Sequence, residues 1–220
     1  MPTEINDKGM IFELNKKILS SLYQVYVNDE YLIEFEPDED MDDHNDTKHH
    51  VGERAVVFRF AHYLQNEINA DNGIEGYSVD CEFNRNTKNL KKLPLPHKTN
   101  NKEGSDLVIP DVVVHYRGTN DNNLLVMEFK TYWNTDQSHD EDKIIGFTSQ
   151  NDVYKYKYGV TVLLEPYCAM IQGYENKNKT HKIQMKKECG KWSVTDELDD
   201  SDALIAFFSK YEERMSEMNW

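Results

Sequence analysis

The chain has 220 residues, of which 38% are hydrophobic and 30% charged, and its formal net charge is -15 at pH 7. This length suits one domain with its own core, and the composition excludes wholesale disorder. No window holds the roughly 18–20 apolar residues of a membrane span, and the first residues lack the regions of a secretion signal. The three cysteines have no CxxC spacing, which argues against a disulfide framework and a zinc ribbon. The sequence predicts a single cytoplasmic domain over residues 1–220, with no membrane partner.

The negative charge is concentrated at the two ends of the chain. Residues 1–50 carry a net charge of -9 and residues 193–220 a net charge of -6, so the segment between them is balanced. That middle segment holds two lysine-rich runs, Arg85 to Lys102 and Lys177 to Lys191. Runs of this kind are usually solvated surface loops. A phosphate-binding surface is the alternative, and it needs support from a motif elsewhere in the chain.

The first 50 residues predict a helix followed by an acidic loop. Apolar spacing favours a helix from Ile5 to Val27, and the short run from Tyr31 to Phe35 is interpreted as a strand or a helix end. The segment from Glu36 to His50 predicts an exposed loop. Its aspartates resemble a calcium loop, but Asp43 stands where an EF-hand needs glycine and His49 where it needs glutamate. We therefore expect no EF-hand.

A second helix is expected from Val51 to Asn69. Glu53 begins an otherwise apolar stripe that continues through Val57, Phe60, Leu64 and Ile68. This spacing places a carboxylate on the inward face of the helix. The alternative is an acid in the first turn that the helix dipole favours.

The rest of the chain predicts strands and helices in alternation. Three strands come first, then a helix, a β-branched strand, two further strand segments and a last helix. The expected ranges are Tyr77 to Phe83, Leu107 to Tyr116, Leu124 to Trp133, Asp140 to about Lys157, Tyr158 to Leu164, Met170 to Tyr174, Lys182 to Thr195 and Asp199 to Met218. This order predicts an α/β domain with a mixed central sheet flanked by helices, plus an N-terminal and a C-terminal helix.

A hairpin between the second and third strands brings charged residues together. If Arg117 pairs with Leu124, Asp111 lies opposite Lys130, and strand alternation puts Glu128 on the same face. The β-carbons of the two acids are then about 7 Å apart. A slip of one residue would turn Asp111 to the other face. The pairing thus predicts two carboxylates and a lysine at one site.

This arrangement suits metal-assisted cleavage of a phosphodiester. Carboxylates of Asp111 and Glu128 are oxygen ligands for a hard cation such as Mg²⁺ or Mn²⁺, which polarises a phosphate and acidifies a water. Lys130 would stabilise the negative charge that grows on the phosphate. The alternative is an acid–lysine pair across a solvated hairpin. The apolar character of both strands favours the metal site.

The same residues resemble a known superfamily. Pro110-Asp111 is similar to the PD element, and Glu128-Phe129-Lys130 to the (D/E)XK element, of the PD-(D/E)XK, or restriction-endonuclease-like, nucleases. The element order over about residues 51–165 also resembles that core, which leaves residues 1–50 as a helix and acidic loop and 166–220 as a strand and helix extension. The resemblance implies the catalytic residues Asp111, Glu128, Lys130 and Glu53, and the metal ligands Asp111, Glu128, Phe129 and Glu53.

The resemblance also implies a Mg²⁺-dependent deoxyribonuclease whose partner is DNA. Some exonuclease-type members carry a QxxxY element on the helix after the lysine, and Gln150 and Tyr154 match its letters. The lysine-rich runs would then contact backbone phosphates. The expected nucleic-acid contacts are Lys88, Lys91, Lys92, Lys98, Gln150 and Tyr154.

Two other functions stay open. The first is a non-catalytic interaction protein on the same fold, whose acidic surface mimics nucleic acid or docks on a basic partner. The second is an RNA-directed enzyme of that fold. No helix-turn-helix or zinc module accompanies the motif, so sequence specificity would come from loops, from a homodimer or from a protein partner.

Overall fold

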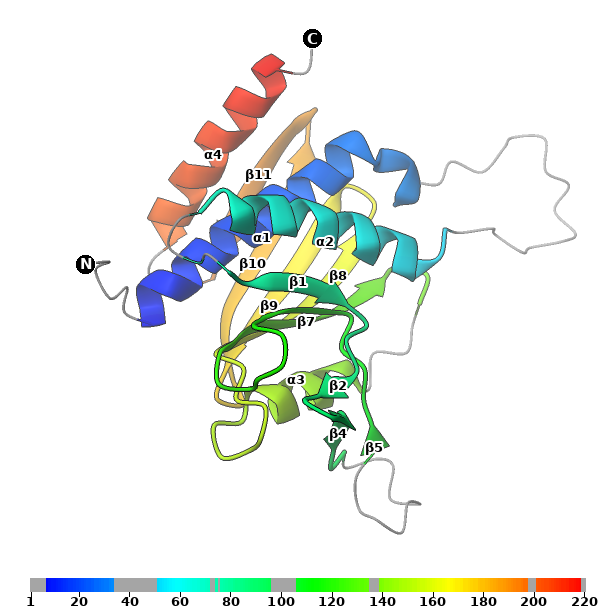
Figure 1. The fold of residues 1–220 in the computed structure, drawn as a ribbon. Coiled ribbons are helices and arrows are strands. Elements are labelled where there is room, and N and C mark those ends of the chain that lie inside the picture. Colours follow the sequence, from blue (N-terminus) through cyan, green and yellow to red (C-terminus); the bar gives the residue numbers. More distant parts are fainter. Residues whose placement is uncertain are drawn as a thin grey trace, which may run out of the picture.

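A mixed seven-stranded sheet forms the centre of the computed structural model, which describes residues 7–33, 51–71, 74, 76–95, 106–134, 139–197 and 201–218. The strand order is β1-β6-β7-β8-β9-β10-β11 (Figure 1). Strands β7 and β8 are parallel, and the other neighbours in this sheet are antiparallel. The expected α/β class with a mixed central sheet is confirmed.

The elements follow the order expected from the sequence, with several short additions. The strands of the central sheet are β1 (Ser78–Cys81), β6 (Val112–His115), β7 (Asn123–Thr131), β8 (Tyr158–Glu165), β9 (Cys168–Glu175), β10 (Asn178–Glu188) and β11 (Lys191–Asp196). The helices in the described ranges are α1 (Asp7–Asn28), the 3-10 turn η1 (Glu30–Leu32), α2 (Glu53–Asn69), α3 (Asp140–Thr148) and α4 (Ser201–Met218). Two small ladders pair β2 (Arg85–Asn86) with β3 (Asn89–Leu90), and β4 (Lys92–Leu93) with β5 (Asp106–Leu107).

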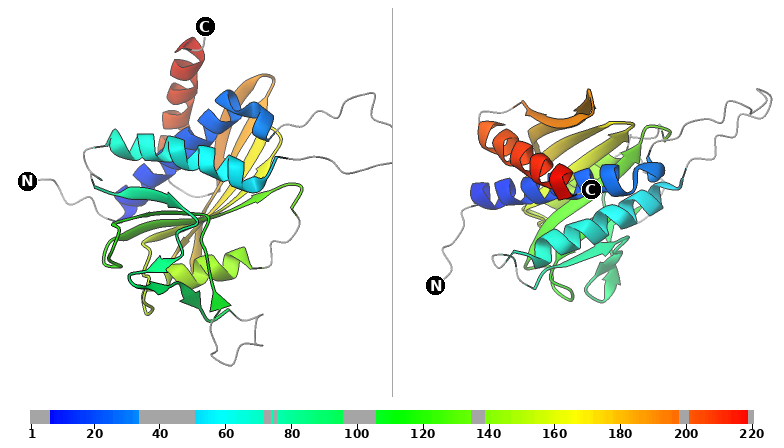
Figure 2. Two further views of the ribbon diagram at one scale, coloured as in Figure 1. Left: turned by 45° about the vertical axis from the view of Figure 1, so that its right-hand side comes forward. Right: turned by 90° about the horizontal axis from the view of Figure 1, so that it is seen from above.

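The helices form two unequal layers around the sheet. Helices α1, α2 and α4 lie on one face, and the short α3 lies on the other (Figures 1 and 2). In β7, Met127 and Phe129 join the core under α1 and α2, while Val126 joins the core under α3. Because side chains alternate along a strand, Glu128 and Lys130 share the α3 face with Val126.

Three predicted helices, α1, α2 and α4, are confirmed, and α3 is shorter than predicted. The apolar stripes of α1 and α2 are buried, as the spacing requires. Helix α3 ends at Thr148, so the prediction that it continues to Lys157 is wrong. The backbone of Ser149 has a ψ of 117°, and the side chain of Asp152 accepts a hydrogen bond from the N–H of Val153 at 2.8 Å. Such local side-chain bonds compete with helix formation and favour a turn.

Two further predicted segments, one near the N-terminus and one in the last part of the sheet, are confirmed only in part. The run that begins at Tyr31 forms the turn η1, which supports a helix end rather than a strand over its described part. The segment expected from Lys182 to Thr195 is split into β10 and β11 by a turn at Cys189 and Gly190, whose φ angles are 50° and 80°. The acidic loop from Glu36 to His50 lies outside the described residues. Among the helices that are described, none has the length and apolarity to cross a membrane.

Candidate functional site

The hairpin that carries the charged motif has a register two residues away from the predicted one. Val112 pairs with Met127, so Asp111, the residue before β6, comes level with Glu128 rather than with Lys130. A shift of two residues keeps every side chain on its face, whereas a shift of one would not. The structure therefore still brings the two carboxyl groups together.

The register differs because the connection between the two strands begins earlier than predicted. The ladder between β6 and β7 ends at His115 and Asn123, with an irregularity between Val114 and His115. Arg117 lies in the turn that follows β6, and its Nε donates to the Asp80 carboxylate on β1 at 2.8 Å. An extra residue on one strand of a pair changes which residues lie opposite each other.

Glu128 is a buried acid with one cationic partner. It is 1% exposed, and its Oε2 lies 2.7 Å from Nζ of Lys143. The other oxygen, Oε1, is buried and has no hydrogen-bond partner in the part of the chain that the structure describes. Burial, and then the neighbouring charge of Asp111, raises the pKa of Glu128 well above its usual value. A buried oxygen without a partner is costly, which points to a ligand at this position.

Asp111 is held beside Glu128 by the backbone of the next strand. Its Oδ2 accepts a hydrogen bond from the N–H of Phe129 at 2.7 Å. Burial raises the pKa of Asp111 to about 6, and the charges of Glu53 and Asp140 act in the same direction. The bond from Phe129 and the charge of Lys143 oppose this rise without cancelling it. Adjacent acids that resist ionisation in this way are typical of functional sites.

Lys130 and Lys143 share one partner, Asp140, at the start of α3. Nζ of Lys130 is 3.1 Å from Asp140 Oδ2, and Nζ of Lys143 is 3.1 Å from Asp140 Oδ1. Burial lowers the pKa of Lys130, but the charges of Asp140, Glu53 and Asp111 together outweigh this and raise it above the usual value. Sequence reasoning missed Asp140 and Lys143. Their signal was an acid and a lysine three residues apart at the start of the helix after the motif.

Glu53 reaches the same end of the sheet from α2. Its Oε2 accepts hydrogen bonds from the N–H and Oγ1 of Thr131 at 3.1 and 3.2 Å, and from Nδ2 of Asn134 at 3.4 Å. Glu53 and Asp111 also line one cavity of about 210 Å³. The structure therefore places Glu53 inward, at the end of β7, as the apolar stripe predicted.

Phe129 takes part in the site through its backbone. Its ring lies in the opposite layer, with its centroid 4.8 Å from that of Phe60. The side chain has no ligand atom and points away from Glu128. The contribution that the structure shows is the N–H group that fixes Asp111.

The lysines expected to bind nucleic acid have different surroundings. Lys88 and Lys92 are exposed, but Lys91 is 1% exposed and donates from Nζ to the carbonyl of Phe83 at 2.8 Å. Burial lowers the pKa of Lys91 to about 8. Lys91 therefore lies in the interior rather than on the expected basic surface, because alternation turns it inward where its neighbour Lys92 points outward. Lys98 lies outside the described residues.

Gln150 and Tyr154 lie in the turn after α3, so the expectation of a QxxxY helix is wrong. The Tyr154 hydroxyl accepts a hydrogen bond from the N–H of Lys92 at 2.7 Å and donates to its carbonyl at 3.1 Å, and Tyr154 is 2% exposed. Gln150 donates from Nε2 to the carbonyls of Thr148 and Tyr156 at 3.1 and 3.2 Å. Gln150 therefore stabilises its own turn, and Tyr154 joins this turn to β4.

The candidate ligands, Asp111 and Glu128, are suited to a hard cation that keeps several water ligands rather than to one held by protein ligands alone. In the described ranges, no three His, Cys, Asp or Glu side chains are grouped closely enough to hold a metal ion by themselves. Asp111 and Glu128 nevertheless supply carboxylate oxygens, one of them buried without a partner. Mg²⁺ usually keeps several waters and takes only one or two protein carboxylates. The carboxylates of Asp111 and Glu128 are therefore compatible in number and chemistry with Mg²⁺ or Mn²⁺ whose remaining ligands are water.

Comparison with protein-family models, curated proteins and solved structures finds no match to this chain. A functional assignment therefore depends on the geometry and chemistry of the site. The strongest features are two adjacent acids with raised pKa values, a lysine on the same face and a second lysine paired to the buried acid.

Proposed function

We propose that the protein is a phosphodiesterase that cleaves DNA with the help of Mg²⁺ or Mn²⁺. The observation that carries this proposal is the pair of carboxyl groups of Asp111 and Glu128 beside Lys130. Both acids have raised pKa values, and Glu128 Oε1 is buried without a partner among the residues described. A divalent cation would neutralise both acids at once, whereas the ion pairs of Lys143 and Lys130 are with Glu128 and Asp140.

Each residue has a role that follows from its position. Asp111 and Glu128 would hold the cation, which supplies a polarised phosphate and an activated water. Lys130 would stabilise the charge that develops on the phosphate, because its ammonium lies on the same face of β7 two residues from Glu128. Asp140 holds Lys130 in place through the contact at 3.1 Å. Glu53 fixes the end of β7 through Thr131.

The order of elements supports a restriction-endonuclease-like core. Helix α2 precedes the antiparallel meander β1-β6-β7, and α3 leads into β8, which is parallel to β7. A helix, a three-stranded meander, a helix and a further strand make up the core of that superfamily. The proposal assigns the additional strands β9 to β11 and helices α1 and α4 to extensions of this core.

The position of the exposed lysines supports DNA as the substrate. Leu93 on β4 packs in the same small core as Ile144 and Phe147 of α3, so β4 lies beside α3. Lys92 is exposed at the start of β4 and therefore lies on the α3 side of the sheet, like Glu128. Lys88 is exposed in the preceding turn. We propose that both lysines contact backbone phosphates of DNA that crosses this side.

Cleavage assays test this proposal. Supercoiled plasmid and single-stranded DNA are incubated with the wild type, with Glu128→Gln and with Asp80→Asn, in Mg²⁺, in Mn²⁺ and in EDTA. The wild type and Asp80→Asn should cleave with either metal ion, while Glu128→Gln and every sample in EDTA should not. Unlabelled RNA as competitor tests an RNA-directed enzyme. Equal cleavage by Glu128→Gln and the wild type would contradict the proposal.

One observation favours the alternative of a non-catalytic protein on the same fold. Lys143 already supplies a positive charge 2.7 Å from Glu128, so part of the acid cluster is neutralised without a metal ion. A purely structural cluster would bind no Mn²⁺ and cleave nothing. Titration calorimetry with Mn²⁺, run beside the cleavage assay, therefore separates the two functions.

A further inference from the structure

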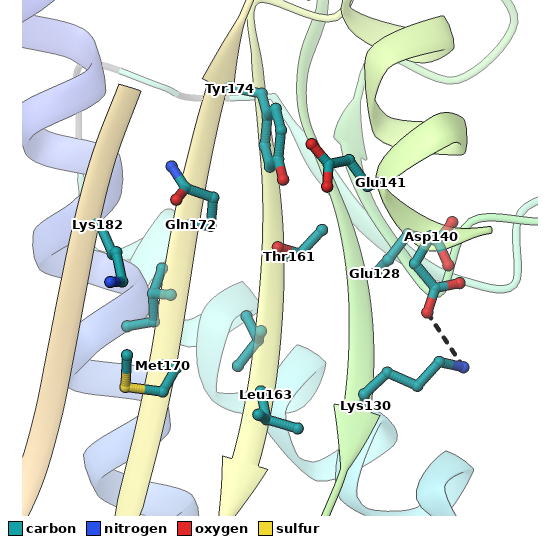
Figure 3. Close-up of a pocket in the computed structure, with 12 residues that line it drawn as sticks. Glu128, Lys130, Asp140, Glu141, Thr161, Leu163, Met170, Gln172, Tyr174 and Lys182 are labelled. Carbon is teal, nitrogen blue, oxygen red and sulfur yellow. Dashed lines mark ion pairs between the residues drawn. The ribbon is translucent and has the colours of Figure 1, made fainter. Parts of the chain in front are cut away.

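A hollow of about 180 Å³ continues from the candidate site across the neighbouring strands (Figure 3). Glu128, Lys130 and Asp140 line one side of it, and Lys182 lines the opposite side. One water molecule needs only roughly 10–15 Å³ of such space. The site therefore opens into a space for part of a larger ligand, beyond a metal ion and its waters.

The strand register aligns polar side chains across this hollow. Glu128 is level with Thr161, Thr161 with Gln172, and Gln172 with Lys182, on four successive strands β7 to β10. Neighbouring strands are about 4.8 Å apart, so Lys182 lies about 14 Å from Glu128 across the sheet. The row thus begins at a candidate metal ligand and ends at an ammonium group.

The floor beside this row is apolar and fixed. Leu163 and Met170 are level with each other in the next row and are half-buried. Gln172 is held by hydrogen bonds from Nε2 to the carbonyls of Gly173 and His181, at 3.1 and 2.9 Å. The hollow therefore presents a preformed apolar surface with polar groups along one side, which is typical of ligand sites.

The ammonium of Lys182 can exchange its present partner for a ligand. Its Nζ is 2.9 Å from Glu197 Oε1, and the two side chains are 45% and 68% exposed. An exposed ion pair of this kind contributes little free energy, because water screens both charges. A phosphate is therefore able to replace Glu197. Lys130, on the opposite side of the hollow, is the second cation that faces it.

We propose that this hollow binds one nucleotide of a single-stranded DNA segment next to the phosphate to be cleaved, an inference that rests on the proposed nuclease function. The base and sugar pack on Leu163 and Met170, and Lys182 binds the phosphate on the far side. A base stacked inside a duplex does not present its face to such a floor, so the nucleotide must be unpaired. The three acids that also line the hollow each have a lysine partner: Lys143 for Glu128, Lys130 for Asp140 and Lys179 for Glu141. Single strands are usually bound where basic groups lie beside side chains on which the bases can pack.

Fluorescence anisotropy in EDTA tests this inference, because binding is then measured without cleavage. The probes are a fluorescein-labelled oligothymidylate and a duplex of the same length. Lys182→Gln should flatten the log-log salt dependence for the single strand by about 0.7, the slope of one phosphate contact. Met170→Gln should weaken single-strand binding about fourfold, the effect of one buried methylene group, and leave that slope unchanged. Lys210→Gln, an exposed lysine on α4 in the opposite layer, is the matched control.

The outcomes separate this inference from the nuclease proposal. Single-strand binding that both variants weaken, with Lys210→Gln unchanged and melting temperatures alike, supports the nucleotide site even if no cleavage is found. Cleavage by the wild type together with unchanged binding in both variants overturns the nucleotide site alone. Competition by thymidine monophosphate as strong as by the oligonucleotide would also overturn it, because the hollow would then be a site for a free nucleotide.

Discussion

Two acidic clusters lie close together, and their pKa values are shifted in opposite directions. The first is Asp80 with its partners Arg117 and His115, and the second is the pair Asp111 and Glu128. On β1, Asp80 accepts bonds from Arg117 at 2.8 Å and from His115 at 2.9 Å, and the bond from Arg117 is the main reason that its pKa lies below the usual value. Just before the start of β6 and on β7, burial raises the pKa values of Asp111 and Glu128 respectively. The first cluster is internally satisfied and needs no ligand. The second is not, and this difference is the physical reason for placing a cation there.

The largest expected effect is on the rate of DNA cleavage, after replacement of the lysine beside Asp111 and Glu128. Lys130→Ala should lower the rate of DNA cleavage about 10²-fold or more and leave Mn²⁺ affinity unchanged, because a group aimed at the transition state contributes to rate rather than to metal binding. Single-turnover cleavage and titration calorimetry measure the two quantities, with Lys210→Ala as the control. If excess Mg²⁺ restored full activity, Lys130 would be a structural counter-ion.

Removing a cation from each of the two sites should affect Mn²⁺ affinity at only one of them. Lys143→Met should strengthen Mn²⁺ binding, on the order of tenfold at about pH 8, because the cation no longer competes with a lysine 2.7 Å from Glu128. Arg117→Met removes a cation from the Asp80 cluster and should leave Mn²⁺ affinity as it is. Calorimetric titration of both variants checks this. Weaker Mn²⁺ binding by Lys143→Met would show that Lys143 supports the metal site instead of competing with the ion.

Replacing aspartate by asparagine should change the melting temperature of the protein in opposite directions in the two clusters. Near pH 7, Asp111→Asn should raise the melting temperature of the metal-free protein, since it removes a charge that burial disfavours. Asp80→Asn should lower it by about 2–4 °C, since it weakens two hydrogen bonds worth on the order of 1 kcal/mol. Differential scanning calorimetry in EDTA gives both values. Shifts of the same sign would remove the distinction between the clusters.

The smallest expected effect is a change with pH in the difference between the melting temperatures of Asp111→Asn and the wild type. The folded-state pKa of Asp111 is about 6, above its ordinary value of 3.8, so its contribution to stability is complete below about pH 4 and is lost as the pH rises through about 6. Asp111→Asn should therefore melt close to the wild type at about pH 4 and above it at about pH 7. A gap that stayed constant over this range would mean that Asp111 does not titrate there.

The sequence predicted the faces of the sheet better than its register. Alternation along β7 placed Glu128 and Lys130 together, and the apolar stripe of α2 placed Glu53 inward. The partner of Asp111 was misplaced by two residues because the ladder ends at His115 and Asn123 with an irregularity after Val114, and no local sequence pattern marks such an irregularity. The prediction that Asp111 and Glu128 share one face of the sheet is still correct, because a shift by an even number of residues keeps each side chain on its face.

The parts that the sequence missed depend on packing between elements. Lys143 reaches Glu128 only because α3 packs across β7 and β8, which no spacing within α3 reveals. Lys91 looked like one of a run of surface lysines, but the ladder of β4 and β5 turns it inward, where it contacts Phe83. Turn chemistry after Thr148 likewise ended the helix that was expected to carry Gln150 and Tyr154.

The metal site proposed at Asp111 and Glu128 can be located without measuring activity, by anomalous scattering from crystals grown with saturating Mn²⁺. We expect a peak between the two carboxyl groups, with Lys143 displaced from Glu128 Oε2. A map without a peak at this position, with Lys143 still paired to Glu128, would show that the two acids hold no divalent cation.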